Sequence, residues 1–122
     1  MTRVMFDSNA YDAILKHQDS ERIKAARLDV VRTDAQEEEV AQIRDGLKRN
    51  QLMSLLMQGQ PVVAPEMPWD TSRDLIIGIT AAMHADILVT DDKGLTMQLA
   101  KTAPQLHVLT YAAFRTKFLS TP

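Results

Sequence analysis

The apolar residues of this chain gather in short runs, and each run is bounded by polar residues or by glycine and proline. Runs of this kind predict strands that are buried on both faces of a sheet. Four of them stand out, at residues 3–6, 28–32, 87–89 and 106–109. A fifth short strand is predicted at 62–64, within a connector that is punctuated by glycine and proline.

The stretches between these runs carry apolar residues at the three- and four-residue spacing of helices. The longest is expected to be one helix that begins at Thr33 or Asp34. Its apolar face would carry Val40, Ile43 and Leu47. Further helices are predicted over about 8–16, 19–26, 51–57, 75–83, 95–100 and 111–118.

Short polar residues precede several of these helices and are expected to cap them by accepting free backbone N–H groups. Ser8 or Asn9 would cap the first helix. Asp70, Thr71 and Ser72 are cap residues before the central one, where Thr71 with Asp74 has the spacing of a capping box. Trp69, just upstream, is expected to be a packing anchor. The alternation of strands and helices predicts a single α/β domain over 1–122, with a mostly parallel five-stranded sheet between helices in three layers.

The composition is that of an ordinary globular protein, with 45% hydrophobic and 25% charged residues over 122 positions. A formal net charge of -2 gives no global basic field for nucleic acid, although local patches decide such binding. The absence of cysteine excludes disulfides and thiolate metal sites and is compatible with a reducing cytoplasm. Because no apolar stretch suits a signal sequence or a membrane span, we expect a cytoplasmic protein that does not bind membranes.

Acidic residues follow the predicted strands or open the helices that come after them. Four separate connections supply such acids: Asp7, Glu37–Glu39, Asp74 and Asp91–Asp92. The carboxyl ends of parallel strands meet at one edge of a sheet, and α/β folds bind ligands there. The sequence therefore predicts a cluster of carboxylates at this edge.

Several carboxylates at one edge need a neutralising partner, because two of them about 5 Å apart repel by roughly 3 kcal/mol at an effective dielectric of 20. Protons, a basic side chain or a divalent cation could fill that role. An all-oxygen set without nearby histidine or cysteine suits Mg²⁺ or Mn²⁺. Such an ion activates water and stabilises a phosphoryl transition state. Taken singly, each acid also has an ordinary explanation as a helix cap, a turn residue or part of a solvated helix face.

Two parts of the chain resemble the PIN-domain nucleases. Met5–Tyr11, MFDSNAY, is similar to the opening strand of that family and its Asp-x-Asn turn. Asp74–Ala81 together with Ile87–Asp92 is similar to the family's central helix and Thr-x-Asp turn. Residues 33–40, TDAQEEEV, resemble the helix that carries the family's glutamate, whereas residues 50–69 carry no diagnostic match.

Carried over by position, the resemblance implies a quartet of catalytic and metal-binding residues: Asp7, Glu39, Asp74 and Asp92. Glu39 is chosen because an aliphatic residue, Val40, follows it, and Glu38 is the alternative. Asp91 is the alternative to Asp92. Asn9 and Thr90 would be polar supports that orient the carboxylates and the metal-bound water.

The resemblance also implies an activity and partners. The family hydrolyses RNA phosphodiesters with Mg²⁺ or Mn²⁺, so an endoribonuclease acting on single-stranded or structured RNA is expected. Many small bacterial members are VapC-type toxins, which implies a toxin–antitoxin role with an antitoxin protein as partner. A homodimer is also expected, with Tyr11, Ile14, Leu15 and residues 52–57 as candidates for its interface.

Two other functions stay open at this point. A PIN-like module that binds RNA but has lost catalysis would keep the same acids. A receiver-like phosphoacceptor domain has a similar length and an acidic Mg²⁺ pocket, but it needs adjacent acids after the first strand and a lysine after the fifth. Here Asp7 stands alone and the fifth predicted strand ends at Thr110 without a lysine, which disfavours the receiver-like function.

Overall fold

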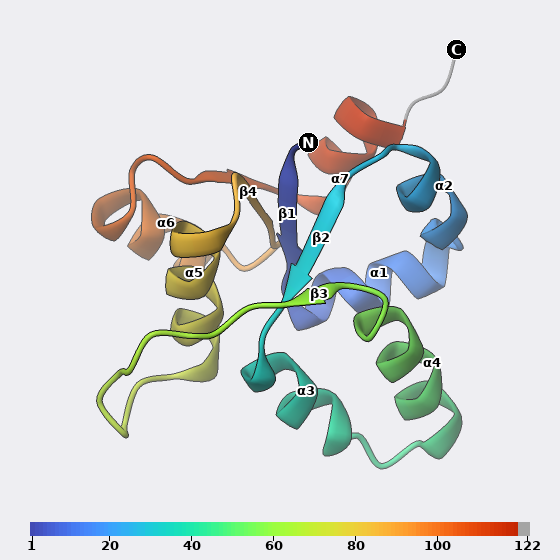
Figure 1. The fold of residues 1–122 in the computed structure, drawn as a ribbon, viewed down its shortest axis with the longest axis horizontal. Coiled ribbons are helices and arrows are strands. Elements are labelled where there is room, and N and C mark those ends of the chain that lie inside the picture. Colours follow the sequence, from blue (N-terminus) through green and yellow to red (C-terminus); the bar gives the residue numbers. More distant parts are fainter. Residues whose placement is uncertain (120–122) are drawn as a thin grey trace.

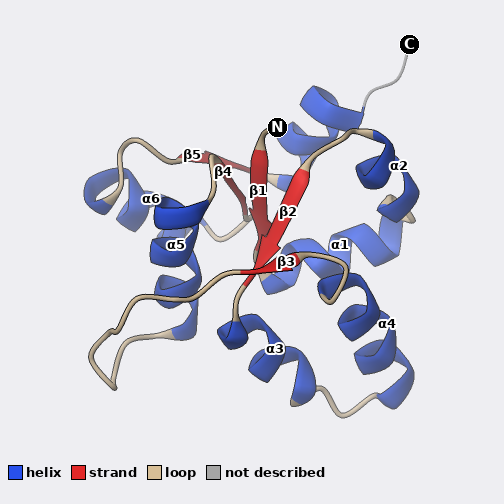
Figure 2. Cartoon of the chain, viewed as in Figure 1, coloured by secondary structure: helices blue, strands red, loops and turns tan. Residues whose placement is uncertain are grey.

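Five short strands, all parallel, form one sheet in the order β3-β2-β1-β4-β5. The computed structural model describes residues 1–119 of the chain. Its strands, drawn red in Figure 2, are β1 (Arg3–Phe6), β2 (Asp29–Arg32), β3 (Gln60–Pro61), β4 (Ile87–Val89) and β5 (His107–Leu109).

At least one helix follows each strand, as parallel pairing requires. The helices are α1 (Ser8–His17), α2 (Ser20–Ala25), α3 (Asp34–Ala41), α4 (Gly46–Leu56), α5 (Arg73–His84), α6 (Lys93–Thr102) and α7 (Tyr111–Phe114), and a π-helical turn over Arg115–Leu119 continues α7. Figure 1 shows α5 and α6 on one side of the sheet and α1, α2 and α4 on the other. The predicted three-layer α/β fold is confirmed.

Strand β1 lies at the centre of the sheet and divides the hydrophobic core in two. Val4 and Phe6 pack with α1, α4 and α7 on one face, while Met5 packs with α5 and α6 on the other. All three side chains are buried, because successive residues of a strand point to opposite faces and helices cover both. This burial fixes the end of β1, and with it the position of Asp7.

Helices α5 and α6 approach each other closely at Gly78. A Cβ atom at this position would lie 2.9 Å from one terminal methyl carbon of Leu99, which is shorter than side-chain contacts allow. Glycine therefore lets the two helices pack at this distance on their face of the sheet. The packing holds α5, which begins with Arg73 and Asp74, against the sheet.

The long helix predicted from Thr33 onwards is wrong, because the chain breaks into α3 and α4 between residues 41 and 46. Asp45 causes the second start: its Oδ1 accepts the backbone N–H groups of Leu47 and Lys48, at 3.0 and 3.2 Å. Leu47, which was expected on the apolar face, is consequently 72% exposed. A local cap has outweighed the apolar spacing here.

The third strand was predicted at the wrong residues: β3 covers Gln60–Pro61, and none of residues 62–64 belongs to it. Gly59 is buried, and its carbonyl accepts a hydrogen bond of 3.1 Å from Nε of Arg32. This contact and the pairing of Arg32 with Pro61 hold the short strand beside β2. The remaining strands lie within one residue of their predicted bounds.

One helix cap differs from expectation, since Asp7, not Ser8 or Asn9, caps α1. Of the three candidates before the central helix, Ser72 caps α5 by accepting the Leu75 N–H group at 3.2 Å. In both helices the N-cap is the residue directly before the first helical turn. Within residues 1–119, none of the helices combines the length and apolar character that crossing a membrane requires.

Candidate functional site

The order of the strands places a switch point between β1 and β4. From β1 the chain moves outward through β2 and β3, then crosses back to β4 and continues outward on the other side through β5. In open α/β sheets, ligands bind outside the carboxyl ends of the strands where the order reverses in this way. Asp7 directly follows β1 and Thr90 directly follows β4, so both lie at this point.

Asp7 is held in place by hydrogen bonds from both sides of the switch point. Its Oδ1 accepts the backbone N–H of Ala10 at 2.8 Å, which caps α1, and its Oδ2 accepts the hydroxyl of Thr90. Its own backbone N–H donates to the carbonyl of Val89 at 3.1 Å. The carboxylate is 5% exposed, so its orientation is fixed by the two strands and not by solvent.

The electrostatic surroundings of Asp7 disfavour its charged form. Burial is the largest cause and raises the pKa of the Asp7 carboxyl above its ordinary value, against the two hydrogen bonds, which lower it. The negative charges of Asp74 and Asp91 raise the pKa of Asp7 further. The charges of two further carboxylates, each from another connection, therefore act on Asp7, and a bound cation would offset that repulsion.

Asp74 stands in the first turn of α5 and is exposed. Among the described residues its side chain makes no hydrogen bond or ion pair, so the carboxylate is available to a ligand. The helix dipole favours a negative charge at this position. The position of Asp74 is thus explained by helix stability alone, and its carboxylate is also suited to binding a cation.

The two aspartates that follow Thr90 have different hydrogen-bond partners. Asp92 caps α6, since its Oδ1 accepts the Leu95 N–H at 3.0 Å, and its own N–H donates to the Thr90 hydroxyl oxygen at 3.1 Å. Asp91 accepts the backbone N–H of Tyr111 at 2.9 Å through Oδ1. The charge that acts on Asp7 is that of Asp91, the alternative of the sequence analysis.

The three glutamates of α3 are separated by their partners. Glu37 forms an ion pair with Arg32, and Glu38 lies 3.9 Å from a guanidinium nitrogen of Arg73 while its side chain stays mostly exposed. Oε2 of Glu39 is buried, and no hydrogen-bond partner is found for it within residues 1–119. An unpartnered buried carboxylate oxygen suits a ligand position, which favours Glu39 over Glu38. Glu39 is nevertheless not among the acids whose charge acts on Asp7.

One polar residue near Asp7 was not predicted to matter. Gln36 is fully buried, donates from Nε2 to the carbonyl of Phe6, and accepts the Thr33 N–H at 2.9 Å through Oε1. It ties the start of α3 to the end of β1, immediately before Asp7. The spacing from Thr33 to Gln36 is that of a capping box, which is the signal that could have identified it.

Of the two predicted polar supports, only Thr90 contacts a predicted site residue. It is buried, and its hydroxyl lies between Asp7 and the backbone of Asp92. Asn9 is exposed and caps no helix. The prediction that Trp69 is a packing anchor is wrong, because this residue is 96% exposed in the connector before α5.

The oxygen atoms of these acids have the chemistry that a hard divalent cation prefers. Their arrangement, however, is not that of a complete metal site. All of the acids offer oxygen ligands, Asp7 is buried among negative charges, and Oε2 of Glu39 lacks a partner. Over residues 1–119, however, no three acidic or histidine side chains already stand close enough together to hold a metal ion. The residues that would hold such an ion are Asp7, Asp74, Glu39 and one of Asp91 and Asp92.

The sequence was also compared with known proteins. It matches no model of a protein family, and a search of curated proteins finds no significantly similar sequence.

Proposed function

We propose that this protein is a Mg²⁺- or Mn²⁺-dependent endoribonuclease that hydrolyses RNA phosphodiesters and acts as the toxin of a toxin–antitoxin pair. The observation that carries the proposal is the meeting of Asp7 and Thr90 at the switch point of the sheet, with the charges of Asp74 and Asp91 acting on Asp7. Helix caps alone do not require acids from three connections to interact. A site for a divalent cation does.

In this proposal each residue has a defined part. Asp7, Asp74, Glu39 and one of the two aspartates after Thr90 would hold the cation, which when bound would activate a water and offset charge on the phosphate. Thr90 orients the Asp7 carboxylate by donating to it, and Gln36 fixes the strand end from which Asp7 projects. A carboxylate that is both buried and oriented needs little reorganisation to hold a cation, and such preorganisation is what favours a charged transition state.

Two residues that precede Asp74 in the sequence suit a single-stranded RNA substrate. Arg73 precedes it and is partly exposed, with Glu38 and Gln42 as its nearest acceptors at 3.9 and 3.4 Å, so a phosphate could replace them. The exposed indole of Trp69 is available for stacking on an unpaired base. These features support RNA as the substrate class, since aromatic stacking and arginine–phosphate contacts are the usual means of binding single strands.

The sheet order argues against two other α/β functions. Receiver-like domains have the strand order 2-1-3-4-5, whereas the order here is 3-2-1-4-5. Dinucleotide-binding domains share the present order but carry a glycine-rich turn after the first strand. That turn is Asp7-Ser8-Asn9 here, and its buried carboxylate would repel a pyrophosphate.

The test is cleavage of single-stranded and structured RNA oligonucleotides with Mn²⁺, Mg²⁺ or EDTA. Wild-type protein is expected to cleave with either metal ion and not with EDTA, and Asp7→Asn and Asp74→Asn are expected to lose at least a hundredfold in rate. Asp70→Asn is the matched control, because Asp70 is an exposed acid of the connector before α5. Equal rates for wild type, Asp7→Asn and Asp74→Asn would refute the site.

The same variants separate an enzyme from an RNA-binding module without catalysis. If wild-type protein binds Mn²⁺ in a calorimeter and binds RNA but leaves it uncut, the catalytic part of the proposal fails and the binding module remains. The toxin role has its own test: expression of wild type should arrest bacterial growth, whereas expression of Asp7→Asn should not. Normal growth with a cleavage-competent wild type would contradict the toxin role alone.

A further inference from the structure

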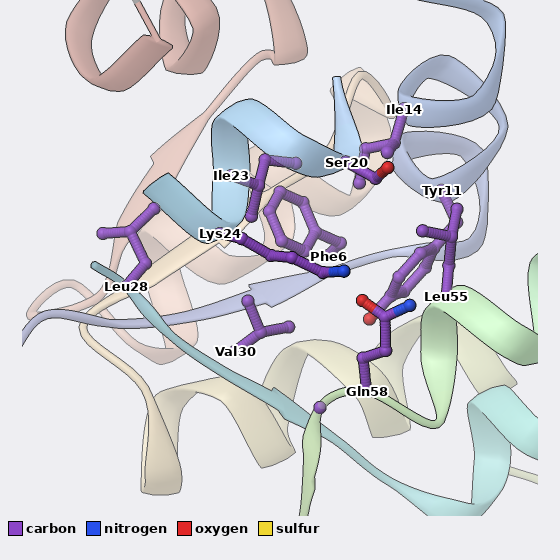
Figure 3. A pocket seen from close by; sticks show the side chains of 11 residues that line it. Phe6, Tyr11, Ile14, Ser20, Ile23, Lys24, Leu28, Val30, Leu55 and Gln58 are labelled. Atoms are coloured by element: carbon purple, nitrogen blue, oxygen red, sulfur yellow. The ribbon is translucent and has the colours of Figure 1, made fainter. Parts of the chain in front are cut away.

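A second site lies on the other side of β1 from α5 and α6. Between α1, α2, α4 and β2 there is a cavity of about 140 Å³, whose apolar lining includes Phe6, Ile14, Ile23 and Leu55. Figure 3 shows these side chains around it, with Leu28 and Val30 of the β2 region also among the lining residues. None of the lining residues is acidic, so the cavity is chemically unlike the acidic edge described above.

The phenol of Tyr11 is the observation that points to a ligand. Tyr11 is 3% exposed and lines the cavity, and among residues 1–119 its hydroxyl has no hydrogen-bond partner. Burial raises the pKa of Tyr11 well above its ordinary value, so the hydroxyl keeps its proton and remains a donor. A buried donor without an acceptor destabilises a fold, and such groups therefore call for an explanation. An acceptor supplied by a bound molecule provides one.

The charges around the cavity are positive. Figure 3 shows Lys24 extending across the cavity in front of Phe6, with Tyr11 and Gln58 at the opposite side. Its ammonium group has one acidic neighbour, Glu21, at 3.4 Å, and both side chains of that pair are largely exposed. The positive charge of Arg32 also acts on the Tyr11 hydroxyl. An acceptor that carries a negative charge fits this setting best.

The volume limits the size of the molecule. An engineered protein cavity of roughly 150 Å³ binds benzene, so the present cavity suits one ring or a short branched chain. Residues such as Ile23 and Leu55 would contact that apolar body. We propose that the cavity binds a small carboxylate with a one-ring or short aliphatic body, whose carboxylate accepts from the Tyr11 hydroxyl and pairs with Lys24.

The experiment measures binding of benzoate and of hexanoate to the full chain by amide chemical-shift titration. A ligand of this size is expected to bind with a dissociation constant of about 1 mM. Tyr11→Phe should weaken binding about tenfold, equivalent to about 1.4 kcal/mol, and Lys24→Gln should weaken it about threefold. Benzamide, which keeps the ring but not the charge, should bind more weakly than benzoate.

Tyr111→Phe is the matched control. Its hydroxyl is also buried but already donates to Asp19 at 2.6 Å, outside the cavity. The control should leave benzoate affinity unchanged and lower the thermal midpoint of the free protein, whereas Tyr11→Phe should keep or raise that midpoint. This stability readout does not depend on the identity of the ligand.

Three results would overturn the proposal. The first is that neither carboxylate shifts the amides of α1 and α2. The second is equal binding by wild type and Tyr11→Phe, or equal binding of benzoate and benzamide. The third is a lower midpoint for free Tyr11→Phe, which would mean that the hydroxyl already has a partner. None of these measurements involves RNA or a divalent cation, so the proposal stands or fails separately from the nuclease function.

Discussion

The substitution Thr90→Val tests the contact that joins the two strands at the switch point. Valine has nearly the shape of threonine but lacks the hydroxyl, so the change removes hydrogen bonds and leaves no cavity. In the wild type this hydroxyl donates to Asp7 and accepts the N–H of Asp92 at 3.1 Å. The variant therefore isolates the polar role of Thr90.

The expected loss of stability follows from these two bonds. A hydrogen bond to a charged group contributes about 1.5–3 kcal/mol, and one between neutral groups contributes about 1 kcal/mol. Because Asp7 is buried and loses a donor, Thr90→Val should lower the free energy of unfolding by about 2.5–4 kcal/mol. Thr90→Ser keeps the hydroxyl and should lose only about 1 kcal/mol, the contribution of one buried methyl group.

The assay is urea unfolding of wild type, Thr90→Val and Thr80→Val in EDTA. Thr80 is the control because it is equally buried, while its hydroxyl donates only to the carbonyl of Ile76 in its own helix, at 2.6 Å. Removing that bond should cost less than about 1 kcal/mol. Similar losses for Thr90→Val and Thr80→Val would refute the reasoning.

The pH dependence provides a second check on the same variant. The Thr90 hydroxyl lowers the pKa of Asp7, so its bond stabilises the charged carboxylate. The loss in Thr90→Val should therefore be full where Asp7 is ionised and should shrink as the pH falls and Asp7 takes up a proton. A loss that does not change between neutral and acidic pH would show that Asp7 is not the partner.

Three further predictions follow from other contacts. Asp7→Asn should stabilise the metal-free protein at neutral pH, because the folded-state pKa of Asp7 is raised; the gain should disappear as the pH falls below the ordinary value of 3.8, and a loss of stability at neutral pH would contradict it. Gly78→Ala should destabilise the protein by about 1–3 kcal/mol in urea unfolding, since its Cβ would meet Leu99 at 2.9 Å, and an unchanged midpoint would contradict the close packing of α5 on α6. Trp69→Ala should change stability by less than about 0.5 kcal/mol, because the indole is exposed, but should weaken binding of single-stranded RNA about tenfold in a fluorescence titration; unchanged RNA binding would contradict base stacking.

The sequence was sufficient to predict the parts of the fold that depend on buried strands. Residues 4–6 and 87–89 are short apolar runs bounded by polar residues, and the strands at 3–6 and 87–89 lie where they were expected. Once these strands are parallel neighbours, Asp7 and Thr90 must meet, because each follows directly on a strand end. The prediction of an acidic edge rested on this logic and stays a prediction: the charges of Asp74 and Asp91 act on Asp7, but residues 1–119 hold no group of three acids close enough to bind a metal ion.

What the sequence could not predict depends on contacts between distant residues. The three glutamates at 37–39 are equivalent in the sequence. In the structure they differ in their partners, since Glu37 pairs with Arg32 and Glu38 lies near Arg73. Likewise, Asp91 and Asp92 are equivalent in sequence, but one accepts from the start of α7 and the other caps α6. The helix break has a local origin instead: Asp45 caps a new helix, although the apolar spacing continues through Ile43 and Leu47.

The two proposed sites lie on either side of the end of β1. Phe6 lines the apolar cavity, and the next residue, Asp7, carries the buried carboxylate at the acidic edge. The acidic edge depends on polar contacts between strand ends, whereas the cavity depends on the packing of α1, α2 and α4 over β2. Variants at Thr90 and at Tyr11 therefore test independent parts of the molecule.

The central claim is that the acids at the switch point bind one divalent cation. Titration with Mn²⁺, followed by paramagnetic broadening of backbone amide signals, tests it most directly, because the broadening locates the ion. We predict that the signals of Asp7, Asp74, Thr90 and Asp91 disappear first in the wild type and persist at the same Mn²⁺ concentration in Asp7→Asn. Broadening centred elsewhere, or the same broadening in Asp7→Asn, would contradict the claim.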